Sequence, residues 1–594
     1  MTAPAFGLRL AAVRIENFKS LRDVALAIEP ETTVLIGENN SGKTSFLEAL
    51  DVAFGRRQAQ LTDLYDGPDG RAEHFVIDLR FEPGSGEEFG QGVVDKVGNA
   101  IRVLTEPQSF VIRLTVARSA TDWGLSLSRS YVNGWADNAE EASTLQLLTE
   151  PHVGRDILDL LHFEMLDARR DVVEQLRNRR TYWGRTAAKV ELDPATKSRL
   201  EGELRTLGQE LTESNTVLTQ LRTDLTSLSD VFSGQASVEL EALPRRVDDL
   251  VRAMDIVITS TNSSAFSVEH HGMGTRSLAA LLVFRSYINV VRHDQRADHS
   301  LSVAAFEEPE AHLHPQSQRA VFELLAAIGG QRIVSTHSAH IASIAAPEAY
   351  RLFRKVGALT RVAAVSPYQM SQWNREQVRR LVQLQNPEVL FARVVGVFEG
   401  QTEAAAFPVL ARAWWGERGA DGKGVSFVFT AGAGSAKHII PLLDVLQIPW
   451  VMFCDGDDGG VKGLRAASAA LGRTLDARSP EVVQLPLGHA FETYVVDVAG
   501  CLAEAVAAVN AHPDGDLAAY KTKRQGSKRK DDSIRDYTGP DGERLACLDF
   551  MKEKKGTLGA LLAEELVNAA ADSPQTQLPE LIRAFFSRID GRLS

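Results

Sequence analysis

The sequence predicts a multidomain α/β protein in which an N-terminal α/β unit, interrupted by a helical arm, precedes a second α/β domain with a parallel sheet. Three observations predict this. A glycine-rich loop lies between a strand and a helix near the N-terminus, a leucine-rich helical stretch follows, and two apolar strands in the C-terminal third end in carboxylates. A chain of 594 residues is too long for one core, so several domains are expected.

The composition is that of an ordinary globular protein, with 44% hydrophobic and 24% charged residues. No window approaches ~18 uninterrupted apolar residues, so we expect no membrane span. The first ten residues lack the pattern of a secretory signal, and the three cysteines lack metal-site spacing, so we expect a reducing, cytoplasmic location. The net charge of -13 argues against broad binding to nucleic acid, so any DNA contact must use a local basic surface.

The segment GENNSGKT at 37–44 matches the phosphate-binding pattern G-x-x-x-x-G-K-[ST]. It lies between a strand expected over Thr32–Ile36 and a helix expected over Ser45–Leu50. Backbone N–H groups in such a loop and at the helix start can surround phosphates, with the lysine on the β/γ-phosphates and the threonine hydroxyl on Mg²⁺. The candidate nucleotide-binding residues are Gly37, Asn39, Asn40, Gly42, Lys43 and Thr44.

Far downstream, the apolar run Leu301–Phe306 ends in Glu307 and Glu308. A phosphate loop needs such a partner, because one carboxylate orients the Mg²⁺ shell and the next polarises the attacking water. We assign support of the metal to Glu307 and the role of catalytic base to Glu308. A further strand, Arg332–Val334, leads to His337, which is placed to sense the γ-phosphate.

The segment HGMGTRS at 271–277 opens a helix expected over Leu278–Phe284 and forms a second small anion-binding helix start. Its candidate nucleotide contacts are Gly274 and Ser277.

Between these motifs the period becomes helical from Asp156. A heptad frame of leucines, interrupted at Ser214, predicts a helical arm or antiparallel hairpin. The arm is either a dimer contact or an amphipathic helix packed on its own domain. The leucines are Leu200, Leu204, Leu207, Leu211, Leu218, Leu221, Leu225 and Leu228.

The C-terminal third carries a second candidate site. The apolar strand Val394–Glu399 ends in a carboxylate, with Glu403 one helical turn further on, and the strand Pro449–Cys454 ends in Asp455 and Asp457. Acidic side chains at the carboxyl ends of neighbouring parallel strands converge on one crevice, where they repel unless cations are present. Hard oxygen ligands suit Mg²⁺ or Mn²⁺, and two such ions can cleave a phosphodiester. Taken alone, Asp455–Asp458 also fits a surface acidic turn.

Together, the phosphate loop, the glycine-rich helix start, the strand with two glutamates and the strand before the histidine resemble the ATP-binding-cassette ATPases. The long helical arm between loop and acidic strand narrows this resemblance to the RecF/SMC-like branch. Two departures are Glu307 in place of the usual aspartate, and GMGTRS in place of the transporter signature. The resemblance implies that two heads sandwich ATP, with the Gly272–Ser277 stretch of one head contacting the nucleotide held by the other.

The strand-Glu-x-x-x-Glu and strand-Asp-x-Asp pattern resembles the Toprim domain of topoisomerases, primases and certain nucleases. The resemblance implies a first metal on Glu399 and Asp455, with Asp457 and Glu403 supporting it or a second ion. Glu492 matches the extra acidic ligand that many Toprim nucleases carry.

Two basic features accompany this second site. Lys554 is a candidate for stabilising the pentavalent phosphate, and Lys552 and Lys555 are alternatives for the same role. The basic segment Lys521–Asp532 is expected to be a flexible loop that contacts the phosphate backbone.

A RecF/SMC-like head ahead of a Toprim domain resembles the overcoming-lysogenization-defect (OLD) family nucleases, most of all class 2 and the ATPase–nuclease subunit of Gabija antiphage systems. This implies ATP binding, metal-dependent DNA cleavage or nicking, a homodimer or higher homo-oligomer, and bacterial antiphage defence, with a helicase-like partner as a further possibility. The expected domains are an N-terminal lobe (1–155), a helical arm (156–255), a C-terminal lobe (256–390) and a Toprim domain with a helical C-terminal region (391–594).

Two other functions compete with an ATP-regulated endonuclease. One is a DNA-clamping ATPase with a non-cleaving Toprim domain. The other, a primase- or topoisomerase-like enzyme, is disfavoured because no active-site tyrosine setting or zinc-binding module accompanies the pattern.

Overall fold

The computed structural model describes most of the chain. The described residues are 7–168 (69, 85, 104, 106 and 120–123 excepted), 193–214, 257–258, 266–295, 301–366, 375–380, 382, 386–430, 435–529, 532–570 and 573–593. Half of the predicted heptad leucines, from Leu218 to Leu228, lie outside them.

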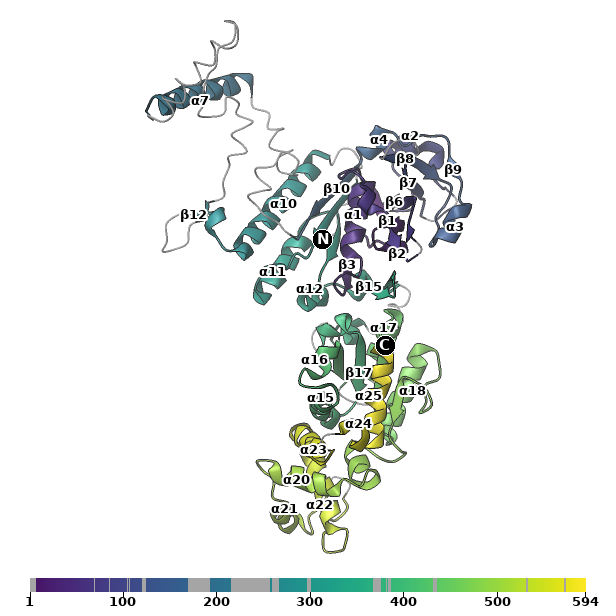
Figure 1. Ribbon diagram of the computed structural model, residues 1–594, viewed down its shortest axis with the longest axis vertical. Helices are drawn as coiled ribbons and strands as arrows, with labels where there is room; N and C mark the ends of the chain where they lie inside the picture. Colours follow the sequence, from purple (N-terminus) through teal and green to yellow (C-terminus); the bar gives the residue numbers. More distant parts are fainter. Residues whose placement is uncertain are drawn as a thin grey trace.

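The head contains two six-stranded sheets (Figure 1). The first is antiparallel in the order β2-β1-β6-β7-β8-β9. Its first two strands form the hairpin expected from the alternating sequence near the N-terminus. The strands are β1 (Leu8–Phe18), β2 (Leu21–Ala27), β6 (His74–Pro83), β7 (Phe110–Arg118), β8 (Leu125–Val132) and β9 (Leu147–Leu148); the helices after them are α2 (Gln91–Val97), α3 (Ala139–Thr144) and α4 (Arg155–Leu158).

The second head sheet has the order β10-β13-β14-β3-β15-β16, with every neighbouring pair parallel except the last. Because β3 and β13 flank β14, the strand ends that carry the phosphate loop, the two glutamates and the histidine share one edge. The strands are β3 (Thr32–Gly37), β10 (Leu161–Leu166), β13 (Leu301–Glu307), β14 (Gln331–Ser335), β15 (Tyr350–Val356) and β16 (Leu359–Ala364); the helices are α1 (Lys43–Ala53), α10 (Met273–Gln295), α11 (Pro315–Ala326) and α12 (Ala339–Ile344).

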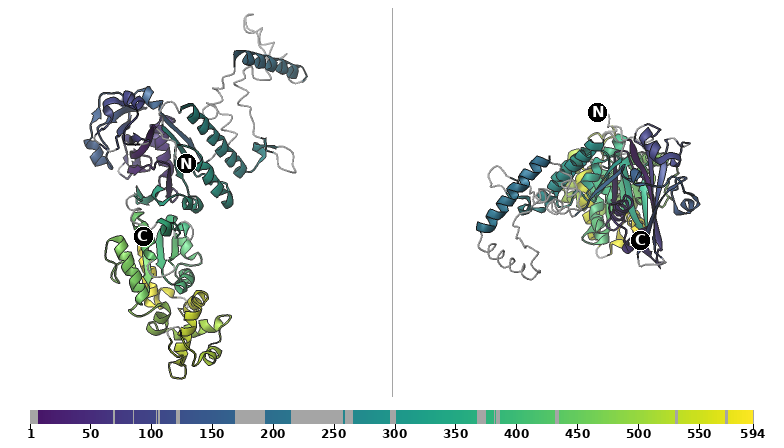
Figure 2. Two further views of the ribbon diagram at one scale, coloured as in Figure 1. Left: turned by 180° about the vertical axis from the view of Figure 1, so that it is seen from behind. Right: turned by 90° about the horizontal axis from the view of Figure 1, so that it is seen from above.

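Strand β10 lies inside the range where only the helical arm was expected, and it pairs with β13 along its whole length. The head sheet therefore extends beyond residue 155. The described part of the arm is α7 (Pro194–Ser214), which stands apart from the head sheets in Figures 1 and 2. Its side chains Leu207 and Leu211 are exposed.

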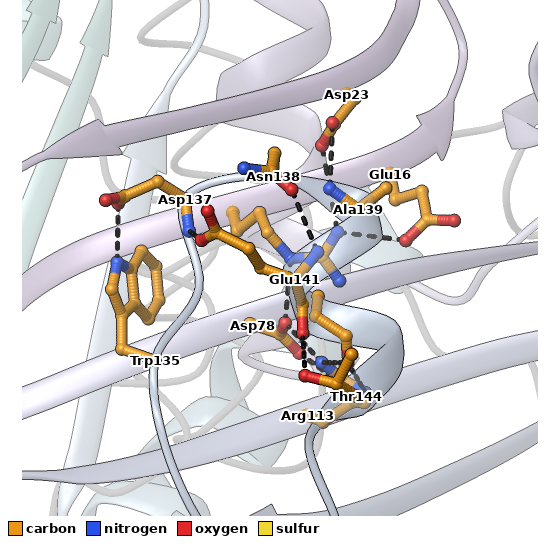
Figure 3. Close-up of polar contacts among 12 residues, drawn as sticks. Glu16, Asp23, Asp78, Arg113, Trp135, Asp137, Asn138, Ala139, Glu141 and Thr144 are labelled. Carbon is orange, nitrogen blue, oxygen red and sulfur yellow. Dashed lines mark hydrogen bonds and ion pairs between the residues drawn. The ribbon is translucent and has the colours of Figure 1, made fainter.

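A buried ion-pair network ties the antiparallel sheet together (Figure 3). Asp78 accepts from Arg14 at 2.9 Å and from Arg113 at 2.7 Å, joining β6 to β1 and β7. Asp23 on β2 accepts from the N–H of Ala139, the first residue of α3. These contacts fix the β1–β2 hairpin, whose turn packs against the phosphate loop.

The second α/β unit has a parallel sheet in the order β18-β17-β19-β20, so its strand ends also share one edge. Figure 1 shows this unit below the head. The strands are β17 (Val394–Phe398), β18 (Val425–Phe429), β19 (Trp450–Cys454) and β20 (Val482–Gln484); the helices are α15 (Gln401–Trp415), α16 (Gly419–Lys423), α17 (Ala436–Val445) and α18 (Asp458–Leu471).

The chain ends in helices that pack beneath this sheet, and the last one returns along it toward the head (Figure 1). They are α19 (Phe491–Thr493), α20 (Leu502–Ala511), α21 (Leu517–Arg524), α22 (Gly542–Glu553), α23 (Lys555–Ala570), α24 (Pro574–Gln577) and α25 (Glu580–Leu593). None of the helices in the described residues is long and apolar enough to cross a membrane.

The expected flexible basic loop is partly ordered, which corrects the sequence interpretation. Lys521, Lys523 and Arg524 lie in the last turn of α21, where positive charge is favourable. Arg524 pairs with Glu553 at 2.9 Å, and Arg529 pairs with Asp549 at 2.8 Å. Two of these cations are therefore neutralised within the protein.

The head and the second unit share a hydrophobic cluster. It contains Val34 and Ile36 of β3 together with Val395 and Val397 of β17. Arg354, on β15, adds hydrogen bonds across the junction to the carbonyls of Gln447 and Arg393, at 3.0 and 3.1 Å. The two units are therefore packed together rather than only tethered.

Candidate functional site

The phosphate loop has the backbone that its glycines predict. Gly37 has φ +146°, and a Cβ there would lie 2.2 Å from the carbonyl oxygen of Phe353. Gly42 has φ +107°, and a Cβ there would lie 2.8 Å from the Leu21 side chain in the β1–β2 turn. Only glycine fits either position. Asn40 takes φ +62°, a region that asparagine tolerates, and Asn39 is exposed on the same loop.

Lys43 is buried at the start of α1 and points back into its own loop. Its Nζ donates to the carbonyls of Gly37 and Glu38 at 2.9 and 2.8 Å. Burial lowers the pKa of Lys43 to about 8, although neighbouring carboxylates, with Glu308 foremost, act in the opposite direction. An anion such as a phosphate would restore the ammonium form.

The partner residues of the loop meet it at the shared sheet edge. Thr44 Oγ1 donates to Glu307 Oε1, so the hydroxyl and the carboxylate assigned to Mg²⁺ face one another. Burial raises the pKa of Glu307. The Nε2 atom of His337 lies 3.3 Å from Glu308 Oε1, which brings the assigned base beside the assigned γ-phosphate sensor.

The glycine-rich helix start packs against the segment that follows β13. A Cβ at Gly274 would lie 2.8 Å from the carbonyl oxygen of His312. Ser277 is 2% exposed, and its hydroxyl has no hydrogen-bond partner among the described residues. In this conformation its hydroxyl faces the protein interior and not a neighbouring head.

In the second unit, the parallel strands bring the predicted carboxylates together. Glu399 follows β17, Glu403 lies in the first turn of α15, and Asp455 follows β19. Asp457 caps α18, accepting from Gly460 N at 2.9 Å, and Glu492 lies 1% exposed in α19. We name these five residues the carboxylate cluster.

The electrostatics of the cluster are those of crowded, partly desolvated acids. Burial, followed by Asp455 and Asp457, raises the pKa of Glu399 to about 8. Burial, followed by Asp457 and Glu492, raises the pKa of Asp455 to about 7. Burial, followed by Asp455, raises the pKa of Glu403 well above its ordinary value. The cluster therefore binds protons at neutral pH unless a cation takes their place.

Glycines leave room for these acids. A Cβ at Gly463 of α18 would lie 1.9 Å from Glu399 Oε1, and a Cβ at Gly400 would lie 1.9 Å from Glu403 Oε2. A Cβ at Gly456 would lie 2.0 Å from the carbonyl oxygen of Pro486. The sequence did not indicate the roles of Gly463 and Gly456, because they depend on contacts between residues that lie far apart in the chain.

Of the candidate lysines, Lys555 is the one beside the cluster. Its Nζ lies 3.4 Å from Glu492 Oε1. Burial lowers the pKa of Lys555, but Glu492, Glu403 and Asp455 together outweigh burial and raise it. Lys554 instead donates to Asp514 at 2.7 Å. Thr402, which the sequence did not single out, donates to the same Glu492 oxygen at 2.5 Å.

The cluster fits a divalent cation by its chemistry. Glu399 Oε1 is buried and has no hydrogen-bond partner among the described residues, and, besides burial, neighbouring carboxylates raise the pKa of Glu399 and of Asp455. Within the described part of the chain, no three His, Cys, Asp or Glu side chains already converge tightly enough to hold an ion.

Two family models match the chain. The model described as "AAA ATPase domain" matches residues 9–97 and 163–342, and the one described as "Overcoming lysogenization defect protein-like, TOPRIM domain" matches residues 390–457. The first covers the phosphate loop and both glutamates, and the second covers the strand ends that carry Glu399 and Asp455.

Similar proteins span most of the chain. An Escherichia coli (strain K12) protein named "Uncharacterized protein YbjD" is 24% identical over 80% of this chain and 85% of its own length. The "OLD nuclease" of Thermus scotoductus is 23% identical over 75% of this chain and 82% of its own length.

A shorter match is the "DNA replication and repair protein RecF" of Chlamydia caviae, which is 29% identical over 16% of this chain and 26% of its own length. Among solved structures, the Smc head of Pyrococcus furiosus aligns with 61% of this chain and 98% of its own, at 15% identity and a TM-score of 0.32. A TM-score this low carries no argument.

The matches confirm the resemblance to the OLD family and the α/β multidomain fold that the sequence predicts. They do not address class 2 or Gabija membership, which stays a prediction. The chain thus combines a region that matches the AAA ATPase domain model with a later region that matches the OLD-like TOPRIM domain model.

Proposed function

We propose that this protein is a metal-dependent DNA endonuclease or nickase whose carboxylate cluster cuts under the control of ATP bound by the head. The observation that carries the proposal is the convergence of five acids and Lys555 at one edge of a parallel sheet. An ATPase domain joined to a TOPRIM domain, with an OLD nuclease among its relatives, supports the same class of enzyme.

Each residue of the cluster has a proposed role. Glu399 and Asp455 would hold a first Mg²⁺ or Mn²⁺ ion, and Glu403, Asp457 and Glu492 would complete its shell or that of a second ion. Such ions, when bound, would supply an activated water and stabilise the leaving oxygen of a phosphodiester. Lys555, which lies beside Glu492, contributes a positive charge where the pentavalent phosphate develops negative charge.

In the head, the proposed ATP site consists of the phosphate loop from Gly37 to Thr44, with Glu307 supporting Mg²⁺ and Glu308 as the base. His337 senses the γ-phosphate. We further propose that two heads close on ATP through the Gly274–Ser277 start of α10, which makes the protein at least a homodimer. Closure is a two-state element that can open or block access of DNA to the cluster.

The proposed setting is bacterial antiphage defence or DNA processing. The exposed leucines of α7 suit a dimer contact, and the ends of α21 and α22 suit the phosphate backbone of DNA. A helicase-like partner is part of the same proposal and rests on the resemblance alone.

Cleavage of supercoiled plasmid with Mg²⁺ or Mn²⁺ tests the proposal. Glu399→Gln should lower the rate by at least about 10²-fold, because the amide removes one ligand charge while keeping the side-chain shape. Glu417→Gln, at an exposed glutamate beyond the end of α15, should cut like the wild type. Equal cutting by Glu399→Gln and wild type would rule out the nuclease assignment.

A second candidate function is a DNA-clamping ATPase whose TOPRIM domain does not cut. It is supported by the match of residues 9–97 and 163–342 to the ATPase domain model, which this candidate needs as much as the first does. This candidate predicts ATP turnover and DNA binding, with no strand breakage under any divalent metal.

A further inference from the structure

Glu310 lies in the turn that follows β13, two residues after Glu308. Its Oε1 atom accepts three hydrogen bonds: from the Thr336 hydroxyl at 2.7 Å, from the His337 N–H at 2.7 Å and from the Ser338 N–H at 3.1 Å. The three donors are consecutive residues between β14 and α12. One carboxylate oxygen therefore fastens the whole segment that carries His337.

Burial of the charged Glu310 side chain costs free energy. The other oxygen of Glu310, Oε2, is buried without a hydrogen-bond partner among the described residues. Burial raises the pKa of Glu310, and the three hydrogen bonds act against that rise. Charge-assisted hydrogen bonds are about twice as strong as neutral ones, so they offset the cost and make the contact rigid.

The fastened segment faces the ATPase site. Strands β13 and β14 are in register at Glu307 and Ser335, and Glu308 N donates to Ser335 O at 2.9 Å. Beyond that point the ladder ends, so Glu310 supplies the next connection between the two strand ends. On the same segment, His337 Nε2 lies 3.3 Å from Glu308 Oε1.

The hydrogen bonds of Glu310 differ from those of the groups assigned to the reaction. Its Oε1 is occupied by the segment between β14 and α12, whereas Thr44 is paired with Glu307 and His337 with Glu308. The charge of Glu310 also acts on Lys43, where it opposes the lowering of the Lys43 pKa by burial.

We propose that Glu310 is a positioning residue for ATP hydrolysis. Its carboxylate holds the segment from Thr336 to Ser338, so that His337 stays at a fixed separation from Glu308. The inference rests on the proposed function of the head, in which Glu308 is the base and His337 the sensor.

The first test measures how firmly Glu310 holds the segment from Thr336 to Ser338, and it does not depend on ATP turnover. Hydrogen exchange of the His337 and Ser338 amides in the full-length protein should be slow in the wild type and at least about tenfold faster in Glu310→Ala. Glu310→Gln, which keeps an acceptor oxygen, should fall between them. Glu323→Ala, at an exposed glutamate of α11, should match the wild type. Unchanged exchange in Glu310→Ala would overturn the proposal.

The second test measures the consequence for ATP hydrolysis. Glu310→Ala should lower kcat about 10–100-fold with KM for ATP within about threefold, because the hydrogen bonds of Lys43 in the phosphate loop do not involve Glu310. The double variant Glu310→Ala/His337→Ala should be no slower than His337→Ala alone, since the two residues act as one unit. If the reductions in kcat of the two single variants multiplied in the double variant, Glu310 would not act through His337.

The two proposals fail in different ways. A wild-type protein that does not hydrolyse ATP would remove the proposed roles of Glu308 and His337, while the exchange test would still decide whether Glu310 fastens the segment. If the wild type hydrolyses ATP and hydrogen exchange is unchanged in Glu310→Ala, the proposed function of the head stands and the proposed role of Glu310 is wrong.

Discussion

Two neighbouring lysines at the junction of α22 and α23 face different partners. Lys554 is bonded to Asp514, and Lys555 lies beside Glu492. We expect Lys555→Ala to lower kcat for DNA cleavage about 10²-fold, because it removes a positive charge at the reacting phosphate. Lys554→Ala is the matched control and should stay within about threefold of the wild type. Single-turnover cleavage measures both, and the reverse order of effects would assign the role to Lys554.

The charged form of Asp455, which metal binding needs, lowers the stability of the folded protein. Its raised pKa of about 7 means that the folded protein holds this proton longer than the unfolded chain does. Its contribution to stability is therefore lost as the pH rises from the ordinary acid range through about 7. An asparagine side chain at this position would have no charge to gain, while its amide oxygen could still accept from Phe491 N.

The expected result for Asp455→Asn follows from this loss of stability at higher pH. In EDTA, the Tm advantage of Asp455→Asn over the wild type should be smallest near pH 4 and should grow as the pH rises, to roughly 2–4 °C at pH 8–9. Thermal denaturation across pH measures this, with Asp421→Asn as the exposed control. A Tm difference that does not depend on pH would show that the pKa of Asp455 is not raised in the folded protein.

At the scale of elements, helix α18 is fitted to the cluster by a glycine. Gly463→Ala would place a methyl group 1.9 Å from Glu399 Oε1, so Glu399 must turn away from the strand end. Gly591→Ala in α25 meets nothing within 4 Å and should raise stability by about 0.5–1 kcal/mol through helix propensity. We expect Gly463→Ala to weaken metal binding about tenfold, measured by Mn²⁺ titration calorimetry. Equal Mn²⁺ affinity in the two variants would show that α18 does not shape the site.

The sequence predicts those parts of the two sites whose motifs are confined to a few consecutive residues. The phosphate loop with its flanking strand and helix, and the apolar strands ending in Glu307, Glu399 and Asp455, are each defined within a few residues. The contact of Gly463 with Glu399, the three bonds to Glu310 and the choice between Lys554 and Lys555 depend on the packing of separate elements. The sequence alone presents Arg524 and Arg529 as loop cations, because their partners, Glu553 and Asp549, lie 20 or more residues away.

At the scale of the whole molecule, Arg354 joins the head to the second unit. It donates to the carbonyls of Gln447 and Arg393, and Arg393 directly precedes the strand that ends before Glu399. We expect Arg354→Ala to lower the Tm by roughly 2–4 °C, because two carbonyls lose their donor, and to weaken the response of DNA cleavage to ATP. Arg361→Ala, at an exposed position on neighbouring β16, is the control. An unaltered response to ATP in Arg354→Ala would mean that the nucleotide state reaches the cluster by another route.

The central claim is that nucleotide binding and DNA cutting occupy two separate sites in one chain. The most direct measurement is plasmid cleavage with Mg²⁺ or Mn²⁺, with and without ATP, by the wild type, Lys43→Ala and Asp455→Asn, alongside ATP binding by each. We predict that Asp455→Asn binds ATP like the wild type and does not cut. We predict that Lys43→Ala loses ATP binding and cuts at a rate that ATP no longer changes. Cutting by Asp455→Asn at the wild-type rate would contradict the account.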